Sequence, residues 1–265
     1  MRVLVLPGGG AKGFALLGVL KALEECEMDP DVMVGVSIGA LIAVGYSIVG
    51  DANRLIEISE ILSRKVGSIL PSFNTKSRFF RFIASIYVST FSQVMSLERR
   101  MKLLKPHLED LKFEDLKKKV VMISTDLKSG EMVIHETGSV YKALISTMSI
   151  PGIFPSVEMN DSVLCDGGVL TNLPIDVALR YDPDEVIAIR MKSSSSFELR
   201  NAVDMMEMVD RTRRSNLENL SIRSSPVDIT VVDLQLDDVG LLDFKEGVKL
   251  IDVGYSKAIE ILKAS

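Results

Sequence analysis

Three separated stretches of the chain carry residue types and spacings that could do chemistry. The first, PGGGAKG at residues 7–13, fits the glycine spacing G-x-G-x-x-G. The second, GVSIG at residues 35–39, places Ser37 between two glycines. The third, DGG, begins with Asp166. A glycine loop of this kind can hold a phosphate, whereas a serine on a tight turn can act as the nucleophile of acyl transfer.

The first stretch has the spacing of a dinucleotide-binding turn, carried by Gly8, Gly10 and Gly13. Such a site also needs an acidic residue at the end of the second strand, where it binds the ribose hydroxyls. Ser37 occupies that position instead. A phosphate loop of the form G-x-x-x-x-G-K-[ST] does not fit either, because Lys12 precedes Gly13. A nucleotide-dependent enzyme that uses this loop therefore stays open only as an alternative.

The second stretch predicts a serine nucleophile. Gly35, Ser37 and Gly39 form the motif G-x-S-x-G between an apolar strand and a helix, and in this context the serine oxygen projects from a tight turn. The N–H groups at the start of the following helix favour negative charge beside that oxygen. The structural alternative is that Ser37 only caps the helix.

A serine nucleophile needs a base, and the sequence offers few. Its two histidines, His107 and His135, precede the third stretch, whereas the usual triad of this motif places histidine last in the chain. Asp166 closes a short apolar strand, and open α/β sheets place their sites at strand ends. Asp126 also closes a strand, but we expect it to have a structural role in a turn. Asp166 is therefore the predicted base, with an ordinary Asp-Gly turn as its structural alternative.

The three stretches, in this order, resemble the patatin-like phospholipase family. Further pieces resemble the family as well, namely ISTDLKSGE (123–131), STMSIPGIFPSV (146–157) and TNLPI (171–175). The resemblance covers about residues 1–190 and fades in the tail. It implies an α/β fold and a Ser–Asp dyad that hydrolyses acyl esters.

The resemblance assigns roles to individual residues. Ser37 and Asp166 form the catalytic dyad, and the first glycine loop forms the oxyanion hole. We assign this hole to the N–H groups of Gly8, Gly9, Gly10 and Ile38 and expect supporting roles for Lys12, Gly13, Gly35, Gly39, Gly167 and Gly168. An aspartate base, whose ordinary pKa of about 3.9 lies below that of histidine, predicts hydrolysis that persists well below pH 6.

We expect no cofactor and no metal, since the reaction needs neither and the chain has no calcium loop of the D-x-D-x-D-G kind. The substrate class is a phospholipid, a lysophospholipid or another acyl ester. Two alternatives keep the fold: an acyltransferase that uses an acceptor other than water, and a non-catalytic lipid-binding module.

The elements that must position these residues alternate between strands and helices. This alternation predicts a three-layer α/β fold with a mostly parallel central sheet and helices on both faces. The predicted strands are Arg2–Leu6, Asp31–Val36, Val120–Ser124, Glu131–Glu136, Ser162–Cys165, Glu185–Arg190 and Val227–Val232. The predicted helices are Phe14–Glu25, Ile38–Val49, Asn53–Val66, two within 76–105, Val140–Ser149, 197–222 and Phe244–Lys263.

Composition sets the remaining expectations. The 265 residues are 47% apolar and 25% charged, which is typical of a soluble globular protein. The absence of a recognisable signal peptide predicts a cytoplasmic location, and Cys26 and Cys165 are expected to be reduced thiols. The net charge of −5 argues against a nucleic-acid partner. We expect a single domain over 1–265, with helices and a strand in 191–265.

Residues 64–105 stand apart from the rest of the chain. They carry nine Lys or Arg residues against one acidic residue, Glu98, and several aromatic residues. We interpret this segment as a variable helical insert that makes a peripheral contact with an anionic membrane at its inner face. The structural alternative is a core helix with a solvated charged face. The sequence does not determine the oligomeric state.

Overall fold

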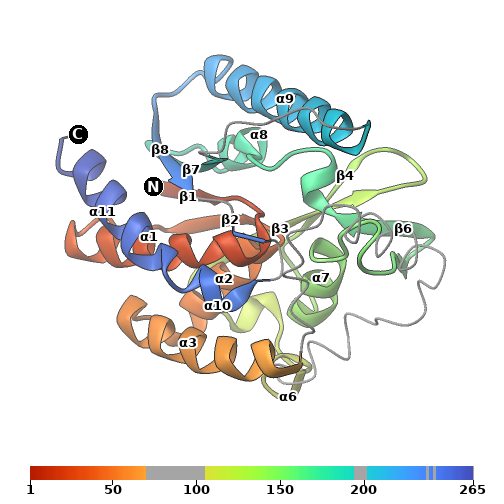
Figure 1. The fold of residues 1–265 in the computed structure, drawn as a ribbon, viewed down its shortest axis with the longest axis horizontal. Helices are drawn as coiled ribbons and strands as arrows, with labels where there is room; N and C mark the ends of the chain where they lie inside the picture. The colour runs from red at the N-terminus through yellow and green to blue at the C-terminus, as the bar shows by residue number, and fades with distance from the viewer. Residues whose placement is uncertain (70–104, 194–201, 237–238, 241–242, 265) are drawn as a thin grey trace.

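The computed structural model describes residues 1–69, 105–193, 202–236, 239–240 and 243–264 (Figure 1). The helices predicted within 76–105 lie almost wholly outside these residues, as does the start of the helix predicted over 197–222. The membrane contact expected of 64–105 therefore stays a prediction. None of the described helices is both long and apolar enough to cross a bilayer.

A mixed, mostly parallel sheet forms the centre of the molecule, as the alternation of elements predicted. Its strands pair in the order β5-β6-β3-β2-β1-β7-β8, and β4 also pairs with β3. The run from β3 to β8 is parallel, whereas β4 and β6 are antiparallel to β3 and β5 is antiparallel to β6. The strands are β1 (Arg2–Leu6), β2 (Val32–Val36), β3 (Lys119–Asp126), β4 (Met132–His135), β5 (Val157–Met159), β6 (Ser162–Asp166), β7 (Glu185–Ser193) and β8 (Ile229–Leu236).

Helices cover both faces of this sheet (Figure 1). One face packs against α1 (Phe14–Glu25), α2 (Ile38–Val49) and α11 (Leu250–Leu262), and the other against α8 (Ile175–Ala178) and α9 (Ala202–Arg223). The parallel strands β1 and β2 are apolar at nearly every position because both of their faces are buried. The other described helices are α3 (Ala52–Ile69), α6 (Lys105–Leu108), α7 (Val140–Thr147) and α10 (Phe244–Gly247), with short 3-10 turns η1 (Gly10–Gly13), η3 (Phe113–Asp115), η4 (Gly167–Val169) and η5 (Leu179–Tyr181).

Several elements differ from the sequence prediction, and β5, α6 and α8 were not predicted. The closing helix is two helices, α10 and α11. Gly247, the last residue of α10, lies so close to η1 that a Cβ there would stand 2.5 Å from the Ala11 carbonyl oxygen. β3 continues to Asp126, since β6 pairs with its last residues. β6 itself ends at Asp166, so this residue is the last of its strand rather than the first of a turn.

The single domain predicted over 1–265 stays a prediction. The sheet supports it, because β7 and β8 join the same sheet as β1. The last helix, α11, packs against α1, so the two ends of the chain share one layer.

Candidate active site

Ser37 lies on a strained turn between β2 and α2. Its backbone has φ 54° and ψ −120°, a conformation that residues with a side chain rarely adopt. The flanking glycines make this turn possible: a Cβ at Gly35 would stand 2.5 Å from Ala40 Cα, and one at Gly39 would stand 2.3 Å from the Leu6 carbonyl oxygen. The turn therefore has the geometry that the G-x-S-x-G spacing predicted.

Hydrogen bonds fix this turn to the neighbouring helix α7. The Ser37 N–H donates to Thr147 Oγ1 at 3.0 Å, and the Thr147 hydroxyl donates to the Ile123 carbonyl on β3. Both residues are buried, and Ser37 is only 4% exposed. The backbone of Ser37 is thus held from two sides, which keeps the position of its hydroxyl defined.

Ser37 and Asp166 are close because two strands end against the same edge of β3. Ile123 pairs with β2 at Val36 and with β4, whereas the next residue, Ser124, pairs with β6 at Asp166 and with β4. Since β4 occupies one edge of β3, β2 and β6 must share the other edge. They run toward each other along it, so the end of β2 meets the end of β6.

The carboxylate of Asp166 lies in this junction and is only 6% exposed. Its Oδ1 accepts a hydrogen bond from the Gly168 N–H at 2.8 Å. Burial raises the pKa of Asp166 to about 6, and this rise is opposed by hydrogen bonds from the Ser37 hydroxyl and Gly168 and by the charge of Arg214. The Ser37 hydroxyl is thus a close neighbour of this carboxylate, and the carboxylate is a stronger base than an exposed aspartate.

The glycine loop follows β1 and lies beside Ser37, since a Cβ at Gly8 would stand 3.1 Å from Ser37 Cβ. Within the described part of the chain, no group accepts a hydrogen bond from the N–H of Gly9, Gly10 or Ile38. Gly8 differs from the expectation, because its N–H already donates to Asn172 Oδ1 at 2.9 Å. We therefore leave Gly8 out of the proposed oxyanion donors and keep the other three.

Asn172 is the residue of this site that sequence reasoning did not single out. Its side-chain amide accepts from the Gly8 N–H and donates to the Gly8 carbonyl at 3.1 Å, so it holds both polar groups of that residue. The same amide lies near Gly168, where a Cβ would stand 3.5 Å from Asn172 Oδ1. The stretch TNLPI drew attention to this region, but only the structure shows that Asn172 joins the glycine loop to the DGG turn.

The remaining supporting residues line the same loops. Lys12 is half-buried in η1, and a Cβ at Gly13 would stand 2.5 Å from the Ile38 side chain. A Cβ at Gly167 would stand 2.4 Å from the Ile123 carbonyl oxygen, so the turn after Asp166 lies directly on β3. These close contacts explain why glycines occupy both positions.

The two histidines, the alternative bases, have other surroundings. His107 is exposed on α6. His135 Nε2 forms hydrogen bonds with Ser124 Oγ at 3.0 Å and Ser146 Oγ at 3.3 Å, and burial lowers its pKa to about 4. In the described residues, neither histidine forms a hydrogen bond with Ser37.

Asp126 has the structural role that we expected for it. Its carboxylate accepts hydrogen bonds from the N–H groups of Lys128 and Val163 and from the Ser129 hydroxyl. These bonds, the one from Lys128 first, lower the pKa of Asp126 to about 2. Asp126 is thus a weak base that holds a turn together.

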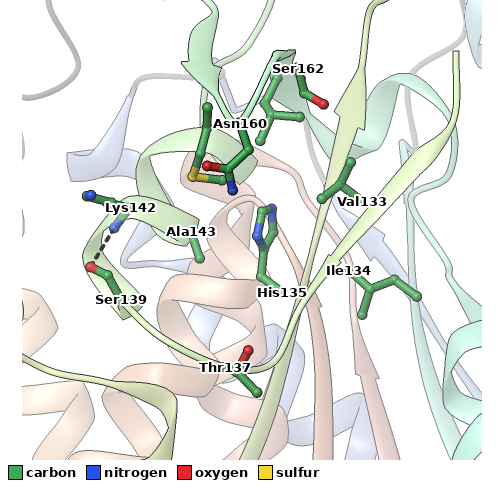
Figure 2. Close-up of a pocket in the computed structure, with 11 residues that line it drawn as sticks. Val133, Ile134, His135, Thr137, Ser139, Lys142, Ala143, Asn160 and Ser162 are labelled. Atoms are coloured by element: carbon green, nitrogen blue, oxygen red, sulfur yellow. Dashed lines mark hydrogen bonds between the residues drawn. The ribbon is translucent and has the colours of Figure 1, made fainter. Parts of the chain in front are cut away.

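His135 faces a cavity of about 320 Å³ between α7 and the β4, β5 and β6 strands. Figure 2 shows its imidazole among the lining side chains, opposite Asn160. The lining residues are Val133, Ile134, His135, Thr137, Ser139, Lys142, Ala143, Met159, Asn160, Ser162 and Leu164. Neither Ser37 nor Asp166 lines it, so this cavity is a neighbour of the candidate site rather than the site itself.

No group of three or more His, Cys, Asp and Glu side chains among the described residues is arranged to hold a metal ion.

Comparisons with known proteins agree with the arrangement of these motifs. The family model described as patatin-like phospholipase matches residues 4–179. The mouse (Mus musculus) patatin-like phospholipase domain-containing protein 6 is 29% identical over 208 residues, which are 74% of this chain and 14% of that protein. An uncharacterized NTE family protein of Mycobacterium tuberculosis is 25% identical over 289 residues, 98% of this chain and 46% of that protein. The chain thus spans less than half the length of either relative.

A solved structure shares the fold. VipD from Legionella pneumophila superposes with a TM-score of 0.54 at 16% sequence identity, over 99% of this chain and 67% of that one. The glycine loop, the serine turn and the DGG turn all fall within the residues that the family model matches. The chain belongs to the patatin-like phospholipase family.

Proposed function

We propose that this chain is a lipid acyl hydrolase that cleaves carboxylic esters through an acyl-enzyme on Ser37, with Asp166 as the base. One observation carries the proposal: Ser37 and the buried carboxylate of Asp166 meet where the ends of β2 and β6 come together on β3, and burial raises the pKa of that carboxylate to about 6. Family membership supports a lipid ester as the substrate class, because the relatives are named phospholipases. It also favours hydrolysis over the nucleotide-binding alternative for the glycine loop.

The proposed reaction has two steps. Ser37 Oγ attacks the ester carbonyl while its proton passes to Asp166, and the oxyanion of the tetrahedral intermediate accepts hydrogen bonds from the N–H groups of Gly9, Gly10 and Ile38. Collapse of this intermediate releases the alcohol, which takes the proton from Asp166. A water molecule then attacks the acyl-enzyme and gives a proton to the same carboxylate. When this second intermediate collapses, Asp166 returns that proton to Ser37 Oγ and the fatty acid leaves. Each preorganised oxyanion donor contributes about 3 kcal/mol to lowering the barrier.

The elevated pKa of Asp166 revises the expected pH dependence. The base must be deprotonated, so kcat/KM should fall as the pH drops through about 6, rather than persist well below it. A histidine mechanism through His135 would instead lose activity near pH 4, where that imidazole becomes protonated. We expect the acidic limb near pH 6 to remain when His135 is replaced by glutamine. If kcat/KM instead falls near pH 4, and this fall is absent in His135→Gln, the result would contradict the role of Asp166.

The direct test compares Ser37→Ala and Asp166→Asn with wild type on a series of esters of increasing acyl-chain length. Each variant should lose at least about a thousandfold in kcat/KM while keeping its circular dichroism spectrum. Ser215→Ala and Asp252→Asn, which change exposed residues of α9 and α11, are matched controls that should keep full activity. Wild-type rates in either dyad variant would overturn the proposal.

Two further measurements separate the alternatives. Covalent labelling of Ser37 by a fluorophosphonate would exclude a non-catalytic lipid-binding module. Product analysis with added alcohols distinguishes a hydrolase, which releases only the free acid, from an acyltransferase, which forms a new ester.

A further inference from the structure

Helix α9 carries several large apolar side chains that are exposed among the described residues. Of the eleven large hydrophobic side chains that are exposed in the described part of the chain, five belong to this one helix. Met206 is 72% exposed and Leu220 is 61% exposed. Single exposed apolar residues are ordinary, but a cluster along one helix indicates a surface that meets something. We call Met205, Met206, Val209, Leu217 and Leu220 the α9 stripe.

The spacing of the stripe places it on one side of α9. Steps of three or four residues along a helix return to the same face. Such steps connect Met206, Val209, Arg213, Leu217 and Leu220. The apolar side chains of this face are exposed to solvent, whereas the long side chain of Arg213 reaches back to the protein. Figure 1 shows α9 as an outer helix of the molecule, beyond α8.

The opposite side of the same helix is partly polar and faces the protein. Asn219 Oδ1 accepts a hydrogen bond from Arg190 Nη1 of β7 at 2.6 Å. Glu218 lies close to Arg190 and is buried enough to have a raised pKa. A surface helix normally turns its apolar side inward and its charged side to water. In α9 charged and amide groups face the sheet, while the side chains of the α9 stripe are exposed and do not pack in the core of the described residues.

The stripe lies next to the candidate active site. Arg213, in the middle of the stripe, donates from Nη2 to the carbonyl of Val169 at 3.4 Å, and Val169 ends the short turn that follows Asp166. The neighbouring Arg214 is near enough to Asp166 for its charge to act on that carboxylate. Whatever binds the stripe is therefore held beside the dyad.

We propose that α9 docks the protein on a phospholipid surface by inserting the α9 stripe among the acyl chains. This inference rests on the proposed function, because a lipid hydrolase must meet its substrate at such a surface. A single helix with an exposed apolar face can lie in the interface of a bilayer, with that face in the acyl region. Arg213 and Arg223, both exposed on this helix, can reach headgroup phosphates.

The stripe fits a lipid surface better than a second copy of the chain. Stable protein interfaces use about 20–30 residues a side, whereas the stripe offers five side chains on one helix. Arg213 also lies midway between Met206 and Leu220. An antiparallel pairing of two α9 helices about a two-fold axis would therefore place the two positively charged Arg213 side chains against each other. Because Asp210 pairs with both Arg213 and Arg214, apolar insertion rather than charge should dominate binding.

The experiment measures flotation of the full chain with vesicles of neutral phosphatidylcholine, in the Ser37→Ala background so that the lipid stays intact. We expect the protein with wild-type α9 to bind these vesicles, with little loss of binding in 0.5 M salt. The variant Val209→Asp/Leu220→Asp should bind at least about tenfold more weakly. Neutral lipid ensures that the new aspartates act by opposing insertion rather than by charge repulsion. The matched control Leu127→Asp/Val253→Asp changes two exposed apolar residues outside α9 and should bind normally.

A second measurement separates this inference from the proposed function. With an active dyad, Val209→Asp/Leu220→Asp should hydrolyse a monomeric short-chain ester at the wild-type rate but vesicle lipid about tenfold more slowly. If wild type hydrolyses no ester, the proposed function fails, whereas flotation still tests the stripe. The inference is overturned if the α9 stripe variant floats like wild type, if wild type does not float, or if the variant only converts a dimer to a monomer in size-exclusion chromatography.

Discussion

Ser37 is held in a conformation that costs free energy. A positive φ for a residue with a side chain costs about 1–3 kcal/mol, and it persists only where the surroundings impose it. Here the hydrogen bond from its N–H to Thr147 and the close packing of Gly35 and Gly39 impose it. The result is a serine held in one backbone conformation before any substrate binds, so little reorganisation is needed in the proposed reaction.

Asn172 should act on catalysis through the glycine loop. Replacing it with alanine removes both hydrogen bonds to Gly8 and lets the loop move relative to Ser37. We expect Asn172→Ala to lower kcat about 10–100-fold with little change in KM, because oxyanion donors act mainly in the transition state. Steady-state kinetics on a soluble ester measure this split.

The control for this prediction is Asn53→Ala, which removes an exposed amide from α3 and should leave both kinetic constants unchanged. A purely structural role for Asn172 would instead lower the melting temperature and leave the kcat of the folded protein intact. That result would contradict a positioning role.

At the scale of elements, the candidate site exists because two strands end head to head on β3. Strand β2 delivers Ser37 and the antiparallel β6 delivers Asp166, while the loop after β1 supplies the backbone N–H groups. The antiparallel strand β6 continues the edge of β3 beyond the end of β2, at the place where the proposed dyad lies. Displacing the end of any of these strands should therefore separate the reacting groups.

Gly39→Ala tests this dependence on close packing. Its new Cβ would stand 2.3 Å from the Leu6 carbonyl oxygen and 2.7 Å from that of Pro7, so the end of β1 must move. We expect a loss of about 3 kcal/mol in the free energy of unfolding, together with loss of activity. Gly130→Ala is the comparison: its φ of 74° costs about 1–2 kcal/mol, but no atom lies within 4 Å of the added Cβ. Equal urea midpoints for the two variants would disprove the packing argument.

At the scale of the whole molecule, two buried groups make stability depend on pH in opposite directions. Burial raises the pKa of Asp166 from 3.8 to about 6, so the native state favours the protonated form and loses stability as the pH rises through this range. Burial lowers the pKa of His135 from 6.5 to about 4, so stability is lost as the pH falls through that range. In the wild type the two effects largely offset each other between pH 4 and 6.

Single variants should reveal each effect. Relative to wild type, Asp166→Asn should be about 2 kcal/mol more stable at pH 7, with the gain vanishing toward pH 4. His135→Gln should instead gain about 2 kcal/mol relative to wild type as the pH falls from 7 to 4. Urea unfolding across this range measures both differences. If the differences do not change with pH, these groups are not buried as described.

Much of this molecule was predictable because its signals are local. The strand Arg2–Leu6 and the helices Phe14–Glu25 and Ile38–Val49 have the predicted bounds, since apolar runs and glycine turns delimit them. Ser37 and Asp166 were predicted as a pair from motifs and family resemblance, and their catalytic roles stay a proposal. The close contact between Gly247 and η1 was not predictable, because the two segments are far apart in the sequence.

The sequence by itself determined the alternation of elements, the family and the three stretches that carry the chemistry. Tertiary structure decided what those stretches touch: that β6 meets the end of β2, that Asn172 engages the Gly8 N–H, and that α9 turns apolar side chains outward. The physical reason is the distance in sequence over which the interactions act. Turn and helix preferences act between neighbouring residues, whereas strand pairing, burial and the pKa values that follow from them depend on residues brought together only by folding.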